Sequence, residues 1–244
     1  KATGDKILLW RITNSADPVP GSLQTFFGGY KQFGRQYKYS VSPKLATQQH
    51  DMAMYFDVSV HKYYKALQKA QDAGLIAKTP MQQLNGGEPL VAVWIGSSQA
   101  LEKRPYMPDI QSFLLSEYQN MLPRYIIMDD DIKLYRQEFY PLNYFIREAQ
   151  AVGADYIIIA EMDGHQPRNS QNWYINMNQS VFNANGGLIN VISISKLVSP
   201  VSGNMHAAVY AVKEGRTQLK QYLPFIKTRY NKTPQWISLG EIEN

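Results

Sequence analysis

Three apolar segments alternate with two amphipathic ones between residues 88 and 160, and this alternation is the strongest constraint on the fold. The apolar segments "PLVAVWIG", "RYIIMDDD" and "ADYIIIAEM" are short and rich in aliphatic residues, as buried strands are. The intervening segments, "MPDIQSFLLSEYQNMLP" and "PLNYFIREAQAVG", repeat apolar residues at the helical spacing of three and four. We expect Gly153 to end the second helix, and Asp155 to bond turn amides in the loop that leads from this helix into the third strand. The order strand, helix, strand, helix, strand predicts a parallel core sheet.

The pattern changes after residue 160. The segments "NWYINMNQSVF", "GLINVISISKLV" and "NMHAAVYAV" have β-forming composition and are separated by "NGG" and "SPVSGN", which are typical of turns between antiparallel strands. The segment "TQLKQYLPFIKTRYN" predicts a helix interrupted at Pro224. We therefore predict an α/β fold: a mixed sheet with a βαβαβ parallel core, followed by antiparallel strands, with helices on the faces.

Two regions are expected along the chain. Residues 88–244 form the α/β module, and residues 1–87 form an amino-terminal region of uncertain fold, containing the strand "KILLWRI", an aromatic-rich segment and a helix. That helix is predicted over 57–74, with Asp57 as its N-cap and Gly74 at its end. The best candidate for a linker is "TPMQQLNGGEP", residues 79–89.

Composition and charge exclude several classes of function. The net charge of +5 comes from basic residues that are scattered rather than clustered, which argues against a nucleic-acid partner. The absence of cysteine excludes disulfides, thiolate zinc sites and cysteine nucleophiles. No apolar run approaches the length of a membrane-spanning helix, and the start without Met leads us to expect export with a removed leader. No cofactor is predicted.

Acidic residues near two strand ends are the candidates for chemistry. Glu161 and Asp163 stand two apart, which places both carboxylates on one face of a strand. Asp129 and Asp131 follow the preceding strand with the spacing of a divalent-metal motif. These four residues would form the metal site of a transferase or hydrolase. The alternative, which we favour, is that they are solvated residues of a strand end and a turn, with no catalytic role.

Aromatic residues are the candidates for partner binding. The segment "FFGGYKQFGRQYKY" interleaves aromatic and basic residues, a composition found both at protein interfaces and on the core face of a single strand. Both interpretations stay open. The predicted partner-binding residues are Phe26, Phe27, Tyr30, Phe33, Tyr37, Trp173 and Tyr174.

Residues 88–215 resemble a family of bacterial envelope modules. The matching pieces are "LVAVWIG", "IQSFLLSEYQNMLPRYIIMDDD", "AVGADYIIIAEMDG" and "INVISISKLVSPVSGN". The family comprises the curli-secretion lipoprotein CsgG, the penicillin-binding-protein activator LpoB, flagellar outer-ring accessory proteins and the amino-terminal domain of TolB. This chain departs from the family pattern with Ser202-Gly203 in place of Thr-Gly and with the insertion "PRNSQNWYINMNQ".

The resemblance implies an interaction or assembly module without catalytic residues. It also implies a periplasmic or outer-membrane-associated location, of the kind that lipoproteins among these relatives occupy; whether this chain carries a lipid anchor stays open. The partners that it implies are envelope proteins of secretion, flagellar or cell-wall machinery, with a homo-oligomer and peptidoglycan or another glycan as further candidates.

Overall fold

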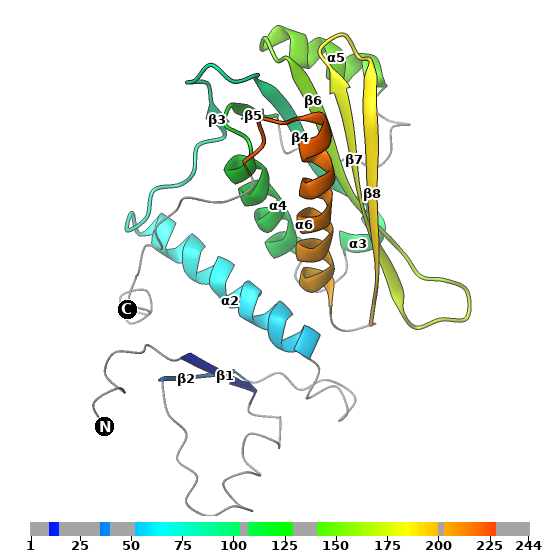
Figure 1. The fold of residues 1–244 in the computed structure, drawn as a ribbon. Helices are drawn as coiled ribbons and strands as arrows, with labels where there is room; N and C mark the ends of the chain where they lie inside the picture. Colours follow the sequence, from blue (N-terminus) through cyan, green and yellow to red (C-terminus); the bar gives the residue numbers. More distant parts are fainter. Residues whose placement is uncertain are drawn as a thin grey trace, which may run out of the picture.

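The computed structural model describes residues 10–14, 35–39, 52–102, 107–128, 141–199 and 203–227 (Figure 1). The elements in chain order are β1 (Trp10–Asn14), β2 (Arg35–Tyr39), α2 (Met52–Asp72), β3 (Gln82–Gln83), β4 (Val91–Ser97), α3 (Gln99–Glu102), α4 (Met107–Met121), β5 (Tyr125–Ile127), α5 (Leu142–Ala151), β6 (Tyr156–His165), β7 (Trp173–Asn183), β8 (Leu188–Val198) and α6 (Asn204–Tyr222). None of the helices within these ranges has the length and apolar character needed to cross a membrane.

A six-stranded mixed sheet forms the centre of the fold, with the strand order β3-β5-β4-β6-β7-β8. Strands β5, β4 and β6 run parallel, as the βαβαβ pattern predicts, and β7 and β8 extend the sheet antiparallel. The central strand β4 is buried along almost its whole length, which is why its sequence is a continuous apolar run. The predicted α/β fold class and mixed sheet are therefore confirmed.

Helices cover both faces of the sheet. The larger core lies between the sheet and the helices α4 and α6, which stand on the near face in Figure 1. A smaller core on the other face is built around α5, where the rings of Trp94 and Phe145 meet edge to face at 5.1 Å between centroids. Because α5 has only 10 residues, its core reaches only part of that face.

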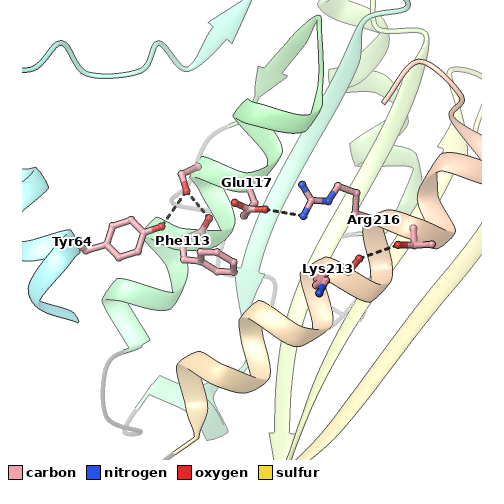
Figure 2. Close-up of polar contacts among 7 residues, drawn as sticks. Tyr64, Phe113, Glu117, Lys213 and Arg216 are labelled. Atoms are coloured by element: carbon pink, nitrogen blue, oxygen red, sulfur yellow. Dashed lines mark hydrogen bonds and ion pairs between the residues drawn. The ribbon is translucent and has the colours of Figure 1, made fainter. Parts of the chain in front are cut away.

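Helix α4 buries one stripe of its surface, as its sequence predicts. Ile110, Leu114, Tyr118 and Met121 are fully buried on this stripe. Glu117 lies next to the stripe and faces α6, where its carboxylate lies 3.8 Å from the guanidinium of Arg216 (Figure 2). The acidic residue thus sits beside the core between two helices.

Residues 204–212 correct a prediction. Their β-forming composition suggested a strand, but they begin α6, which continues without interruption to Tyr222 and ends before Pro224. Buried residues recur along α6 at helical spacing, including Met205, Ala208, Val212 and Leu219. Because that apolar stripe packs against β8 and α4, tertiary burial decides between helix and strand here.

A buried carboxylate explains how α6 begins. Asp57 was predicted to cap its own helix, but α2 starts at Met52 and Asp57 lies inside it. Its carboxylate accepts backbone N–H groups from Gly203 at 2.7 Å, Met205 at 3.1 Å and His206 at 3.3 Å. Burial raises the pKa of Asp57 to about 6, against the lowering effect of these hydrogen bonds. Asp57 therefore caps α6 across the fold, satisfying amides that the helix itself leaves unpaired.

Helix α2 joins residues 52–87 to the rest of the fold. It packs across α4 and α6 (Figure 1). Its His61 Nδ1 lies 2.7 Å from a carboxylate oxygen of Asp109, and the hydroxyls of Tyr64 and Ser116 lie 3.1 Å apart (Figure 2). Further along, β3 falls within the segment predicted as a linker and pairs with β5 at the edge of the sheet. The division of the chain after residue 87 stays a prediction.

Candidate functional site

One face of β6, β7 and β8 carries polar side chains beyond the part that α5 covers. Glu161 opposes Asn178 and Asn178 opposes Ser193, and directly opposed residues of antiparallel strands lie on one face. The alternate residues, such as Met162 and Met177, are buried in the core under α4 and α6. We call this surface the polar sheet face. It consists of Glu161, Asp163, His165, Tyr174, Asn176, Asn178, Ser193 and Ser195.

Hydrogen bonds between neighbouring strands fix the side chains of the polar sheet face. Ser193 Oγ donates to Asn178 Oδ1 at 2.6 Å, and Ser195 Oγ donates to Asn176 Oδ1 at 2.6 Å. Asn176 Nδ2 in turn lies 3.4 Å from His165 Nδ1. These side chains remain at the surface, so their remaining donors and acceptors are available to a ligand.

An aromatic pair lies at the end of the polar sheet face that is farthest from α5. The rings of His165 and Tyr174 stack with centroids 5.3 Å apart, and Tyr174 is exposed. Contact of Tyr174 with a partner stays a prediction. Trp173, its predicted companion, lies on the opposite side of β7 and packs against the edge of the larger core. The two neighbours in sequence therefore do not form one surface.

The two carboxylates of β6 lie inside the strand, which corrects their predicted position at its end. Strand β6 loses its parallel neighbour after Met162, which opposes Ser97 of β4. It then continues to His165 because β7 pairs with it along its whole length. Glu161 and Asp163 lie on one face of the strand, as their two-residue spacing predicts.

The environment of Glu161 changes its acidity. Burial between the neighbouring strands, and secondly the charge of Asp163, raise the pKa of Glu161 to about 7. Both effects disfavour the charged carboxylate. A carboxyl group with this pKa can hold a proton near neutral pH and donate it in a hydrogen bond, or release it when a cation approaches.

Several predicted site residues lie outside the described ranges. These are Asp129 and Asp131 of the metal hypothesis, and Phe26, Phe27, Tyr30 and Phe33 of the aromatic segment. Tyr37 lies on β2, which pairs parallel with β1, but the structure does not describe its side chain. In the part of the chain that is described, no three His, Asp or Glu residues come together as a metal site. The metal hypothesis thus depends on Asp129 and Asp131.

An open cavity of about 490 Å³ lies where the parallel strands β4, β5 and β6 begin, at the end of the sheet away from Glu161 and Asp163. Its lining includes Arg124 and Asp155. Arg124 donates to the carbonyl oxygens of Leu84 and Glu88, and Asp155 accepts the backbone N–H of Leu90 at 2.8 Å. These polar groups hold the loops that enter β4 and β6, so the cavity has a structural explanation.

Comparisons with known proteins give distant structural neighbours. No protein-family model matches the sequence, and no curated protein matches it. The hypothetical protein CT253 from Chlamydia trachomatis is 16% identical with a TM-score of 0.38, over 56% of this chain and 98% of its own. The PelC dodecamer from Paraburkholderia phytofirmans is 11% identical with a TM-score of 0.33, over 54% of this chain and 86% of its own. The lipoprotein GNA1162 from Neisseria meningitidis is 13% identical with a TM-score of 0.31, over 55% of this chain and 99% of its own. At these values the neighbours assign neither a family nor an activity.

Most of the polar sheet face was missed by reading the sequence. The missing residues are His165, Asn176, Asn178, Ser193 and Ser195. The signal that could have found the Asn and Ser residues is their alternation with apolar residues in "INMNQ" and "ISISK", which places polar side chains on one face of each strand. That signal does not tell which strands are neighbours, so it could not have paired the asparagines with the serines.

Proposed function

We propose that this chain is a non-enzymatic protein of the bacterial cell envelope that docks a partner protein on its polar sheet face. The envelope location, periplasmic or attached to the outer membrane as a lipoprotein, follows from the resemblance of residues 88–215 to the modules of secretion, flagellar and cell-wall machinery. The order of strands and helices on which that resemblance rests is the order found in the sheet.

The observation that carries the proposal is the hydrogen-bonded ladder across β7 and β8. Two Ser hydroxyls hold two Asn side chains in fixed orientations at the surface. Ordering flexible polar side chains costs free energy on binding, and here the fold has already ordered them. A rigid sheet surface with oriented amides and an exposed aromatic ring at one end favours docking of a complementary surface.

Charge indicates the kind of partner. The polar sheet face contains two carboxylates, Glu161 and Asp163, and no Lys or Arg, although the chain as a whole carries a net charge of +5. A partner that presents Lys or Arg and side-chain amides is complementary to this surface. Approach of a cation would favour the charged form of Glu161, whose pKa lies at about 7.

Site-specific photocrosslinking in a bacterial host tests this proposal. A photoreactive benzoylphenylalanine replaces Tyr174 on the polar sheet face, and the matched control replaces Tyr63, an exposed tyrosine of α2. We expect a discrete adduct with one basic envelope protein at position 174 and not at position 63. The adduct should weaken in high salt and when Asp163→Lys is added, because both changes reduce the attraction of a basic partner.

Equal adducts at both positions, or none at position 174, would contradict docking on this face. Cosedimentation of the same variants with purified peptidoglycan separates a glycan ligand from a protein ligand. If peptidoglycan binds and Asp163→Lys leaves that binding unchanged, the glycan binds at another surface, and the adducts at position 174 alone decide whether a protein docks on the polar sheet face.

A metal-dependent transferase or hydrolase is the second candidate function. One observation favours it: Glu161 and Asp163 share a face, and Glu161 has a raised pKa of about 7. The test is calorimetric titration with Mn²⁺ and Mg²⁺, in parallel with the double variants Asp129→Ala/Asp131→Ala and Glu161→Ala/Asp163→Ala. Micromolar binding lost in both variants would replace the docking proposal with this one.

A further inference from the structure

Strand β8 forms one edge of the sheet. It pairs with β7 on one side, and within the described ranges no strand pairs with it on the other. It has 11 residues, "LINVISISKLV", of which only Lys196 is charged. Proteins usually protect such an edge with charge, proline or a short strand, because free backbone donors and acceptors recruit another strand. The Lys196 ammonium lies 4.2 Å from the centre of the Tyr210 ring, so it is held against α6.

Apolar side chains accompany this edge on the same side as the polar sheet face. Val191 is 49% exposed and Leu197 is 48% exposed. Two Ser residues of the polar sheet face, Ser193 and Ser195, stand between them along the strand. Along this face the residue types follow the order apolar, Ser, Ser, apolar, which is the same when the strand is followed in the reverse direction. An antiparallel copy of β8 therefore places apolar residues opposite apolar residues and Ser opposite Ser.

We propose that β8 pairs antiparallel with β8 of a second copy of this chain, with Ile194 opposite its own counterpart on a two-fold axis. In this register Val191 lies opposite the partner's Leu197, and Ser193 lies opposite the partner's Ser195. The dimer then contains two pairs of Val191 with Leu197, in which the exposed apolar side chains cover each other. It also contains two cross-strand pairs of Ser193 with Ser195. The contact is self-complementary, as a two-fold interface must be.

Other registers lack this complementarity. Centring the pair on Ser193 places Val191 opposite the partner's Ser195, which leaves the apolar residues unmatched. Centring it on Lys196 brings two like charges into direct opposition, which is destabilising. With Ile194 at the centre, Lys196 lies opposite the partner's Ile192 and the two ammonium groups stay apart.

This homotypic pairing goes beyond the proposed function and does not depend on it. The two sheets join into one, and the two polar sheet faces lie on the same side because opposed residues of antiparallel strands share a face. A dimer would thus present a doubled docking surface. Loss of the dimer with retained adducts at position 174 would leave the proposed function standing, and the reverse result would leave the dimer standing.

Sedimentation velocity of the full chain tests the register through charge. The double variant Val191→Lys/Leu197→Lys opposes like charges twice in the dimer, and the double variant Val191→Lys/Leu197→Glu opposes unlike charges twice. We expect the dimers of the wild type and of the Lys/Glu variant to have dissociation constants below about 100 µM. The dissociation constant of the Lys/Lys variant should be about a hundredfold higher. Both substituted positions, Val191 and Leu197, are exposed, so circular dichroism should show an unchanged fold for either variant.

A wild type that stays monomeric above that concentration would overturn the proposal, as would a Lys/Glu variant that dissociates like the Lys/Lys variant. Disulfide trapping provides an independent readout, because the 244 residues contain no cysteine. Ile194→Cys should cross-link to its counterpart on mild oxidation, and Lys65→Cys on exposed α2 should not. Equal cross-linking of the two variants would contradict pairing through β8.

Discussion

The contact between Tyr118 and Gln179 makes a quantitative prediction about the buried core. Tyr118 of α4 donates its hydroxyl to Gln179 Oε1 of β7 at 2.6 Å, and both residues are almost fully buried. Gln179 Nε2 has no hydrogen-bond partner among the described residues and packs against Gly215 of α6. The wild type therefore buries one satisfied polar pair and one unsatisfied amide group.

Each buried polar group without a partner costs about 1–3 kcal/mol. Tyr118→Phe leaves Gln179 Oε1 unpaired as well, so we expect a loss of about 1–3 kcal/mol in the free energy of unfolding. Gln179→Met removes the unpaired amide but leaves the Tyr118 hydroxyl alone, and the two effects roughly cancel. The double variant removes every polar atom of the contact, so it should be at least as stable as the wild type.

Urea unfolding followed by circular dichroism measures all four proteins, and equal m-values would confirm that their unfolding transitions are comparable. The expected coupling between the two substitutions is larger than about 2 kcal/mol in favour of the double variant. The reasoning is refuted if the double variant is destabilised by the sum of the single effects, or if Tyr118→Phe changes stability by less than about 0.5 kcal/mol.

Two further predictions concern buried and half-buried carboxylates. Burial raises the pKa of Asp57 from its ordinary 3.8 to about 6, so its contribution to stability is complete below 3.8 and is lost as the pH rises through 6. We compare the free energy of unfolding of the wild type with that of Asp57→Asn by urea unfolding. Between pH 3.5 and 7, the wild type should lose up to about 3 kcal/mol relative to the variant. A gain relative to the variant would show that the backbone hydrogen bonds outweigh burial. Asp163→Asn should lower the pKa of Glu161 from about 7, though not to its ordinary 4.5, because burial is the larger cause of the shift. An NMR titration of the Glu161 carboxyl carbon measures this, and an unchanged value would show that Asp163 does not act on Glu161.

Local sequence signals predicted the parallel core accurately. The apolar runs of β4 and β6 and the helical spacing of α4 are each contained within one segment, so no knowledge of distant residues is needed. Gly153, predicted to end the helix α5, follows the C-cap residue Val152 with a φ of 70°. Asp155 bonds the amide of Leu90, which is 65 residues away in the chain, so no local signal indicates this partner. The turn between β7 and β8 forms around Asn183, whose side chain accepts the amides of two turn residues.

The predictions that failed concern residues whose neighbours come from elsewhere in the chain. The segment 204–212 has β-forming residues, and it became helical because its apolar stripe packs on β8 and α4 and because Asp57, far away in sequence, caps its first turn. The sequence predicts the carboxylates of β6 at a strand end because the apolar run stops there. The strand continues because β7 supplies backbone partners up to His165.

Between residues 88 and 199, the sequence by itself determined the alternation of strands and helices, their approximate bounds and the mixed character of the sheet, because burial on both faces and helical periodicity are properties of neighbouring residues. Only the tertiary structure decided the strand order, which face of β6, β7 and β8 stays open, and that β8 lies at the edge. These properties depend on which segments meet across the fold, and pairing between distant strands leaves no local pattern in the residues that form it.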